Sequence, residues 1–324
     1  MMRNKLSILL RAAVSLGLVG LLVWIFRKDL PGIATVLKNV SPYYFLASIL
    51  FNISAVVVVS ERLRMILAVQ KLKISLGESV YLTFIGNFFN NFLPTSIGGD
   101  LVKAYYATKK SERKLESFSA VFFDRFFGFL SIGLLAFLGL VLMNRRIKDP
   151  QILWGCLIFS AVVLAAFVLF LNKSMTKAIF SRLLHLPAFQ KDSKLRKLYN
   201  ALNAYKEHKS IVTKLILISL AAQVLSVVLL YCIIRGISQD VSFLNLLLIM
   251  PLVSVASMIP SINGLGVREG AFVIFLGEFI SKENAAAVSI LFLANILITS
   301  FIGGVLYLFS AKLYKVPIKI NEIV

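Results

Sequence analysis

The sequence has few of the residues that metal centres and nucleophilic active sites require. Its 324 residues include two cysteines and two histidines. Cys156 and Cys232 lie inside apolar stretches, without a CxxC or metal-ligand pattern around them. His185 and His208 lie in a basic connecting stretch that contains no metal motif. We therefore expect no disulfide framework, no metal, no cofactor and no Ser/His or Cys/His catalysis, and we predict that the protein is not an enzyme.

Charge is also scarce, and acidic charge most of all. Charged residues make up 15% of the chain, against about 25% in soluble domains, while 59% of the residues are hydrophobic. Several apolar runs reach the roughly 20 residues that cross a bilayer. These features predict an all-α polytopic membrane protein. The formal net charge of +20 lies between apolar segments, so we assign it to the positive-inside bias and to contact with anionic lipid, not to nucleic acid.

The chain contains apolar segments of two kinds. Six are long enough to span a bilayer, at residues 6–26, 43–60, 118–143, 152–172, 211–234 and 286–310. Two others, 77–93 and 243–259, run into short polar breaks. The segments that return from the breaks, 100–108 and 267–280, are too short to span comfortably at about 1.5 Å per residue.

Basic residues set the expected orientation. The stretch 173–214 holds ten basic and two acidic residues, and 61–76 and 109–116 are also basic, so all three are predicted to be cytoplasmic. Residues 77–108 must then enter and leave on one side, as a re-entrant hairpin or a paired helix and partial helix. By the same rule we expect a multi-pass protein of the cell inner membrane with both termini in the cytoplasm.

The order of elements repeats. Residues 1–143 are predicted to form helix, helix, hairpin, helix, and residues 144–324 repeat that order around a basic insert at 173–210. The insert is either an amphipathic helix on the cytoplasmic leaflet or a plain connector. Three spanning segments separate corresponding helices, so the halves run in opposite directions. An inverted repeat with broken elements in matching positions is a recurring architecture of secondary transporters.

The two polar breaks, at residues 92–100 and 258–269, resemble each other. In each, an apolar helix runs into Pro, then Ser or Thr, then Gly four positions after the Pro, with charge following. Gly98 and Gly99 permit close backbone approach, and Asp100 stands where an N-cap would open the return segment. Backbone N–H groups at such a start suit phosphate. The breaks are either simple capped turns or part of a transport pathway.

Two charged residues lie inside the predicted span 118–143. Asp124 and Arg125 follow about seven residues of that segment. A charge at the centre of a membrane helix costs roughly 2.5–3.5 kcal/mol on insertion scales, so each residue needs a partner. The candidate pairs are Arg125–Asp100 and Asp124–Lys103. They would either clamp the first hairpin or bind the phosphate of a lipid headgroup.

The second half offers counterparts to these charges. Arg268 and Glu269 follow the second break, nearer the outer leaflet. In the helix before the first break, Asn87 and Asn91 share a face at i, i+4, where they could satisfy backbone groups freed at Pro94 or contact a substrate. Two single polar residues in spanning helices are expected to make interhelical hydrogen bonds, Gln223 and Asn295.

Three motifs in order give the chain its resemblance to a known family: the run from Asn91 to Lys103, then Asp124-Arg125, then the run from Pro260 to Glu269. They resemble the lysylphosphatidylglycerol synthase transmembrane-region family, the flippase-like domain of MprF proteins and of stand-alone membrane proteins. The resemblance implies movement of a lipid between leaflets, in MprF an aminoacylated phosphatidylglycerol. By motif position, the resemblance implies a functional role for these residues: Pro94, Gly98, Gly99, Asp100, Asp124, Arg125, Gly264, Gly266, Arg268 and Glu269.

The sequence departs from the family pattern at three positions. Thr95 and Asn263 stand where Gly is expected, and Lys103 stands where Arg is usual. Lys binds phosphate as a point charge, without the bidentate fork of Arg, which bears on headgroup preference. The soluble aminoacyl-transferase domain of MprF has no counterpart here, so lipid aminoacylation is not expected.

Three hypotheses about function follow. The leading one is a flippase or transporter that moves an anionic or modified phospholipid, or a lipid-linked substrate, through a polar cavity at the two hairpins. Its partners are then membrane phospholipids. The alternative is a scaffold subunit for a lipid-modifying enzyme or glycosyltransferase. A membrane enzyme is less favoured. The P-loop motif Gly-x-x-x-x-Gly-Lys-Ser/Thr does not occur, so transport would be passive or driven by an ion or a potential.

Overall fold

The computed structural model describes residues 30–92, 98–111, 114–143, 150–172, 209–258 and 264–314, together with single residues at 20, 27 and between 174 and 205. Every regular element in these ranges is a helix, so the all-α class is confirmed. The predicted span 6–26, the loop around 144–149, most of the insert 173–210, and Pro94 lie outside the described residues. The helices are α2 Leu30–Lys38, α3 Pro42–Val69, α4 Leu76–Phe92, α5 Gly98–Ser111, α6 Lys114–Met143, α7 Pro150–Leu171, α10 Lys209–Gly236, α11 Phe243–Ala256, α12 Val267–Leu276 and α13 Lys282–Tyr314.

Four of the described helices are long and apolar enough to cross a membrane: α3, α6, α10 and α13. They coincide with four of the six predicted spans, and α7 occupies the place of a fifth. The largest difference is at α3, which ends at Val69 and not at residue 60. The predicted cytoplasmic stretch 61–76 therefore begins as helix, and its first two arginines belong to α3.

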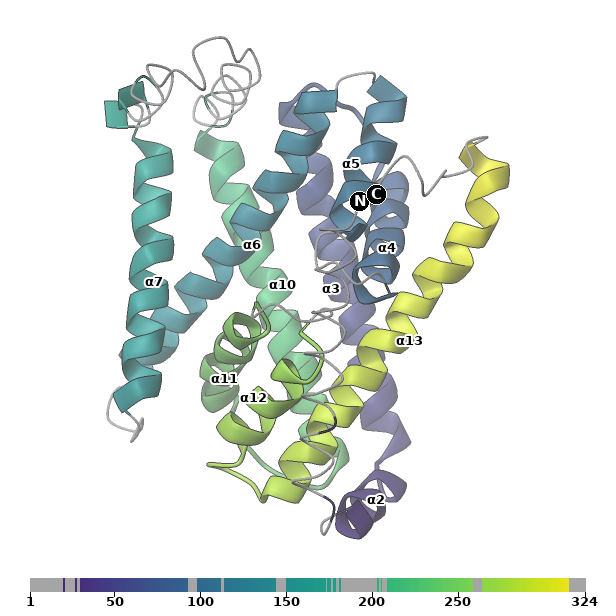
Figure 1. Cartoon of the computed structure of the whole chain (residues 1–324), viewed down its shortest axis with the longest axis vertical. Helices are drawn as coiled ribbons and strands as arrows, with labels where there is room; N and C mark the ends of the chain where they lie inside the picture. Colours follow the sequence, from purple (N-terminus) through teal and green to yellow (C-terminus); the bar gives the residue numbers. More distant parts are fainter. Residues whose placement is uncertain are drawn as a thin grey trace.

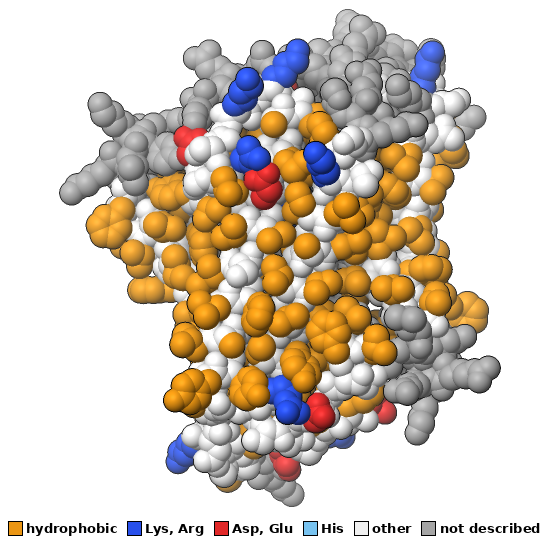
Figure 2. Space-filling model, turned by 180° about the vertical axis from the view of Figure 1, so that it is seen from behind, with side chains coloured by type: hydrophobic (Ala, Val, Ile, Leu, Met, Phe, Trp, Pro, Cys, Tyr) orange, Lys and Arg blue, Asp and Glu red, His pale blue; other side chains and the backbone are white. Residues whose placement is uncertain are grey.

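The outer surface is apolar over most of its height. Figure 2 shows orange side chains across the middle of one face and charged side chains gathered toward its two ends. Many large apolar side chains are more than half exposed, among them Leu50, Ile158, Leu217 and Phe301 at 58–65%. So much exposed apolar surface suits hydrocarbon and not water.

Two pairs of shorter helices lie at opposite ends of the molecule. α4 and α5 occupy the upper half of Figure 1, and α11 and α12 the lower half. The long helices α6 and α13 each contact both pairs: α6 packs on α5 and α11, and α13 packs on α4 and α12. Between them α3 and α10 pack along each other more extensively than any other two helices. The return helices α5, with 14 residues, and α12, with 10, are about 21 and 15 Å long, shorter than the hydrocarbon core.

Glycines let the first pair form. A Cβ on Gly99 would overlap the backbone carbonyl of Gly86, so α4 and α5 cross with backbones in direct contact. A Cβ on Gly303 would likewise overlap the carbonyl oxygen of Phe84, which brings α13 against the other side of α4. Small residues at helix crossings are typical of membrane proteins, where packing replaces the hydrophobic effect as the driving force.

Candidate functional site

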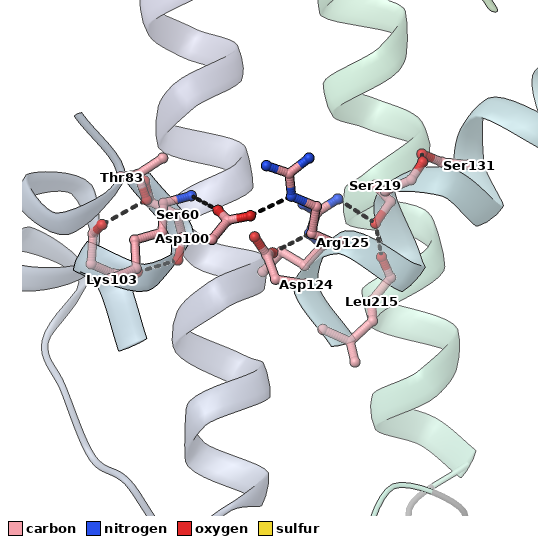
Figure 3. A network of polar contacts seen from close by, with 12 residues as sticks. Ser60, Thr83, Asp100, Lys103, Asp124, Arg125, Ser131, Leu215 and Ser219 are labelled. Atoms are coloured by element: carbon pink, nitrogen blue, oxygen red, sulfur yellow. Dashed lines mark hydrogen bonds and ion pairs between the residues drawn. The ribbon is translucent and has the colours of Figure 1, made fainter. Parts of the chain in front are cut away.

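The first charged cluster is centred on Asp100 in the first turn of α5. Its Oδ1 lies 3.7 Å from Lys103 Nζ, one turn along the same helix, and its Oδ2 accepts a hydrogen bond from Nε of Arg125 on α6. Figure 3 shows Asp100 between the two cations. The predicted Arg125–Asp100 pair is therefore confirmed. Asp100 and Lys103 are 6% exposed, whereas the Arg125 side chain keeps 38% of its surface exposed.

Lys103 reaches this position because α4 has no side chain in its way. A Cβ on Gly86 would overlap the aliphatic chain of Lys103, so the glycine leaves room for the lysine to run across α4. The ammonium group can then lie beside Asp100 while its stem is buried between the helices. Gly86 is thus a site residue that the sequence reasoning missed.

The predicted Asp124–Lys103 pair is wrong, because Asp124 pairs with Arg62 of α3. Nε of Arg62 donates to Oδ1 of Asp124 at 2.7 Å, and both side chains are under 10% exposed. Nη1 of Arg62 also donates to Ser219 Oγ of α10 at 3.1 Å. One arginine thereby joins α3, α6 and α10. The physical reason for the error is the longer α3, which carries Arg62 into the helix packing and not into a loop.

Asparagines near the end of α4 contact the start of α5 and the neighbouring α13. Oδ1 of Asn90 accepts a hydrogen bond from the backbone N–H of Gly99 at 2.8 Å, and so satisfies a donor at the start of α5. Nδ2 of Asn91 donates to the carbonyl oxygen of Asn87 at 2.9 Å and to Ser300 Oγ of α13 at 2.5 Å. The predicted Asn87–Asn91 face therefore exists. Because α5 begins at Gly98, Asp100 lies in its first turn and is not the N-cap.

A further polar contact joins α3 to α13. Nδ2 of Asn295 donates to Ser48 Oγ at 2.7 Å, and Oδ1 of Asn295 accepts from Nδ2 of Asn52 at 2.7 Å. The predicted interhelical role of Asn295 is confirmed. The side chain of the part-buried Gln223 makes no hydrogen bond to another described residue, so its predicted interhelical contact is not formed among them.

Residues 264–266, the described part of the second break before α12, form a turn. Gly264 and Gly266 have φ of 77° and 85°, a left-handed conformation that glycine adopts without steric cost. The backbone N–H of Gly266 donates to Oε2 of Glu269 at 2.6 Å, which caps the helix with a carboxylate where the macrodipole favours one. The return helix α12 begins at Val267, where the predicted return segment 267–280 begins, and it ends at Leu276.

Arg268 and Glu269 pair with each other. Nε and Nη2 of Arg268 donate to Oε1 of Glu269 at 3.1 and 2.8 Å, and both residues are under 10% exposed. The guanidinium carbon also lies 5.9 Å from the ring centre of Phe292 on α13. A buried arginine beside a carboxylate and an aromatic face is stabilised on two sides.

The two clusters differ in net charge. The first contains three cations, Arg62, Lys103 and Arg125, and two carboxylates, Asp100 and Asp124, which leaves it at 3 − 2 = +1. The second contains one of each and is neutral. Burying an ion costs several kcal/mol unless it is paired, so an excess cation at this depth is suited to an anion from outside the protein. Among the described residues, no group of three or more His, Cys, Asp or Glu could hold a metal ion.

Comparison with known proteins agrees with the motifs. The model of the family described as lysylphosphatidylglycerol synthase TM region matches residues 8–304, which include both breaks and every charged residue of the two clusters. A search of curated proteins finds no significant match. With a family match over nearly its whole length and apolar helices that fit a multi-pass membrane protein, the chain belongs to the lysylphosphatidylglycerol synthase transmembrane-region family.

Proposed function

We propose that this protein moves a phospholipid with an anionic headgroup between the two membrane leaflets. The observation that carries the proposal is the first charged cluster. It lies in the half of the molecule formed by α4 and α5, it has one cation more than its carboxylates balance, and its most exposed member is Arg125. A phosphate that enters hydrocarbon needs such a cation, because an isolated anion there is costly.

The position of Arg125 along α6 supports this role. It is eleven residues from the start of the helix at Lys114, or about 16 Å along the axis at 1.5 Å per residue. That depth lies well inside the hydrocarbon layer if α6 spans the bilayer. The guanidinium group offers a planar fork that matches two phosphate oxygens, whereas Lys103 supplies a point charge.

Asp100 gives the cluster a way to exchange partners. Its carboxylate pairs with both Arg125 and Lys103 and offsets part of their charge. A headgroup phosphate presents the same kind of oxygen acceptors and can compete for Arg125. In this mechanism the acyl chains remain in the bilayer while the headgroup follows the polar contacts.

The packing of the helices supports an inverted repeat. Exchanging α3 with α10, the pair α4–α5 with α11–α12, and α6 with α13 turns each contact among these eight helices into another that is also present. The contact of α6 with α11, for example, becomes that of α13 with α4. The broken pairs lie at opposite ends (Figure 1), as expected if they re-enter from opposite membrane faces. Together with the predicted span 6–26, the helices α3, α6, α7, α10 and α13 make six spanning helices in the proposed arrangement. The protein then lies in the cell inner membrane with both termini in the cytoplasm.

Arg268 and Glu269 would serve the other end of the pathway. They are close together and buried, and they open α12 as Asp100 opens α5. The headgroup reaches Arg268 by competing with Glu269 for the guanidinium group. The sequence contains no P-loop motif, so we propose movement down a gradient or coupled to an ion or potential.

A transbilayer assay tests the proposal. Purified protein is placed in liposomes that contain fluorescent phosphatidylglycerol, and the rate at which probe from the inner leaflet becomes accessible to an external quencher is measured. Arg125→Ala and Arg268→Ala should reduce the rate to that of protein-free liposomes, and Arg125→Lys should restore part of it. Arg235→Ala is the matched control, because Arg235 pairs with Asp240 at the surface end of α10.

Two results would contradict the proposal. One is normal lipid movement in both alanine variants, with both shown to be folded by thermal unfolding. The other is a wild-type protein that moves no lipid but co-purifies with a lipid-modifying enzyme or glycosyltransferase, which would favour the scaffold hypothesis.

A further inference from the structure

A second polar feature lies in a recess between α3 and α10, and its charged residues are not members of the two charged clusters. The recess has a volume of about 470 Å³ and is lined by Glu61, Arg64, Met65, Lys214, Leu217 and Ile218. Arg64 lies five residues before the end of α3 and Lys214 five residues after the start of α10. At 1.5 Å per residue, both charges are about 7–8 Å from the helix ends, which is the depth of headgroups on helices that span a bilayer.

The recess has an excess of positive charge. Nε and Nη2 of Arg64 donate to the two carboxylate oxygens of Glu61 at 2.6 and 2.5 Å, so the arginine and the glutamate neutralise each other. Lys214 is exposed, and none of the ion pairs among the described residues includes it. Two cations and one carboxylate leave the recess at 2 − 1 = +1.

Below the charges, the recess continues as apolar surface. Met65, Leu217 and Ile218 line it, and Leu217 is 60% exposed. Val57, one turn before Glu61, and Val224, two turns after Leu217, continue the same faces toward the middle of the helices and are 37% and 40% exposed. A positive group at headgroup depth above an apolar groove matches a phospholipid, with phosphate above and acyl chain below.

We propose that this recess binds an anionic phospholipid of the adjacent leaflet as a resident lipid, separate from any lipid that is transported. Its phosphate contacts Lys214 and the outer edge of Arg64, and one acyl chain lies in the groove between α3 and α10. The site does not depend on the proposed function. It lies behind the buried Arg62–Ser219 contact, because Arg62 is two residues from Arg64 and Ser219 is next to Ile218. A bound lipid therefore braces the two helices that this contact joins.

The test measures lipid selectivity by native mass spectrometry. Protein is reconstituted in nanodiscs with equal amounts of phosphatidylglycerol and phosphatidylcholine, released, and scored for the lipid that remains bound. Wild type should retain phosphatidylglycerol in excess. Lys214→Gln should lower that excess about fivefold, as expected for one basic residue near an anionic surface. Glu61→Gln should raise it, because it releases Arg64 from its carboxylate partner.

Matched charge changes outside the recess separate a site from a general surface effect. Lys73→Gln removes an exposed cation from the loop between α3 and α4, and Glu116→Gln removes a carboxylate from the first turn of α6. Both should leave the retained lipid as in wild type. Equal retention in wild type, Lys214→Gln and Glu61→Gln would overturn the proposal. So would a change in oligomeric state on Lys214→Gln without a change in bound lipid, which would assign the recess to a second copy of the chain.

Discussion

The ion pair between Arg62 and Asp124 offers a sharp energetic test of the fold. Both side chains are under 10% exposed, and the guanidinium group also donates to Ser219 of a third helix. Arg62→Met keeps most of the volume of the side chain but leaves the Asp124 carboxylate buried without its cation. Breaking one partner of a buried pair costs about 3–5 kcal/mol, and we expect a loss in that range. The orphaned Ser219 hydroxyl still donates to the carbonyl oxygen of Leu215, so it adds little.

The double variant Arg62→Met/Asp124→Leu gives the opposite expectation. It removes both charges and replaces them with apolar groups of similar size, a change that is often neutral or stabilising by about 1–4 kcal/mol. The free energy of unfolding of wild type, both single variants and the double variant is measured by denaturant titration in mixed micelles. The singles should be strongly destabilised and the double should recover most of the loss. If the losses of the single variants simply add in the double, the two charges do not compensate each other and the reasoning fails.

The other predictions concern two glycines and one tyrosine. Gly99→Ala should prevent the close crossing of α4 and α5 and abolish folding or lipid movement. Gly77→Ala, at a position with open space around it, should be neutral or stabilising by up to about 1 kcal/mol. Thermal unfolding and the liposome assay measure the two variants side by side. Burial raises the pKa of Tyr205 well above the usual value of about 10, so its contribution to stability is complete below pH 10 and is lost as pH rises above it, when the unfolded chain ionises. Tyr205→Phe should make the unfolding free energy fall less steeply between about pH 10 and 12, and an unchanged slope would contradict this.

The apolar runs predicted the positions of the helices well, because the length of an apolar segment is the main requirement for a membrane span. The predicted breaks fall between α4 and α5 and between α11 and α12. What failed was the rule that a span ends where charge begins. α3 continues past residue 60 with Arg62 buried, since a cation near a helix end is tolerated when two neighbouring helices supply Asp124 and Ser219 as partners. The need of the buried Asp124 for a cation was the available signal, but the sequence did not distinguish Arg62 from Lys103 as that cation.

The capping of α5 by Asn90 could not be predicted from spacing. Asn90 and Gly99 are nine positions apart in the chain, and they meet only because Gly86 and Gly99 let two backbones touch. Local rules assign a cap to the residue just before a helix, and here that segment runs through the break. The Arg125–Asp100 pair was predictable for the opposite reason. Two opposite charges in neighbouring apolar elements have few alternatives at that depth.

The two clusters differ in a way that matters for any ligand that exchanges with them. Asp100 and Arg125 belong to different helices, so a phosphate that replaces the carboxylate loosens a contact between α5 and α6. Arg268 and Glu269 are neighbours on α12, so a ligand that separates them need not move one helix against another. Glu269 also caps α12 through Gly266, and therefore gives up more than one interaction if it turns away. Under the proposed function, binding at the first cluster is thus linked to helix movement, and binding at the second is opposed by the local stability of the turn.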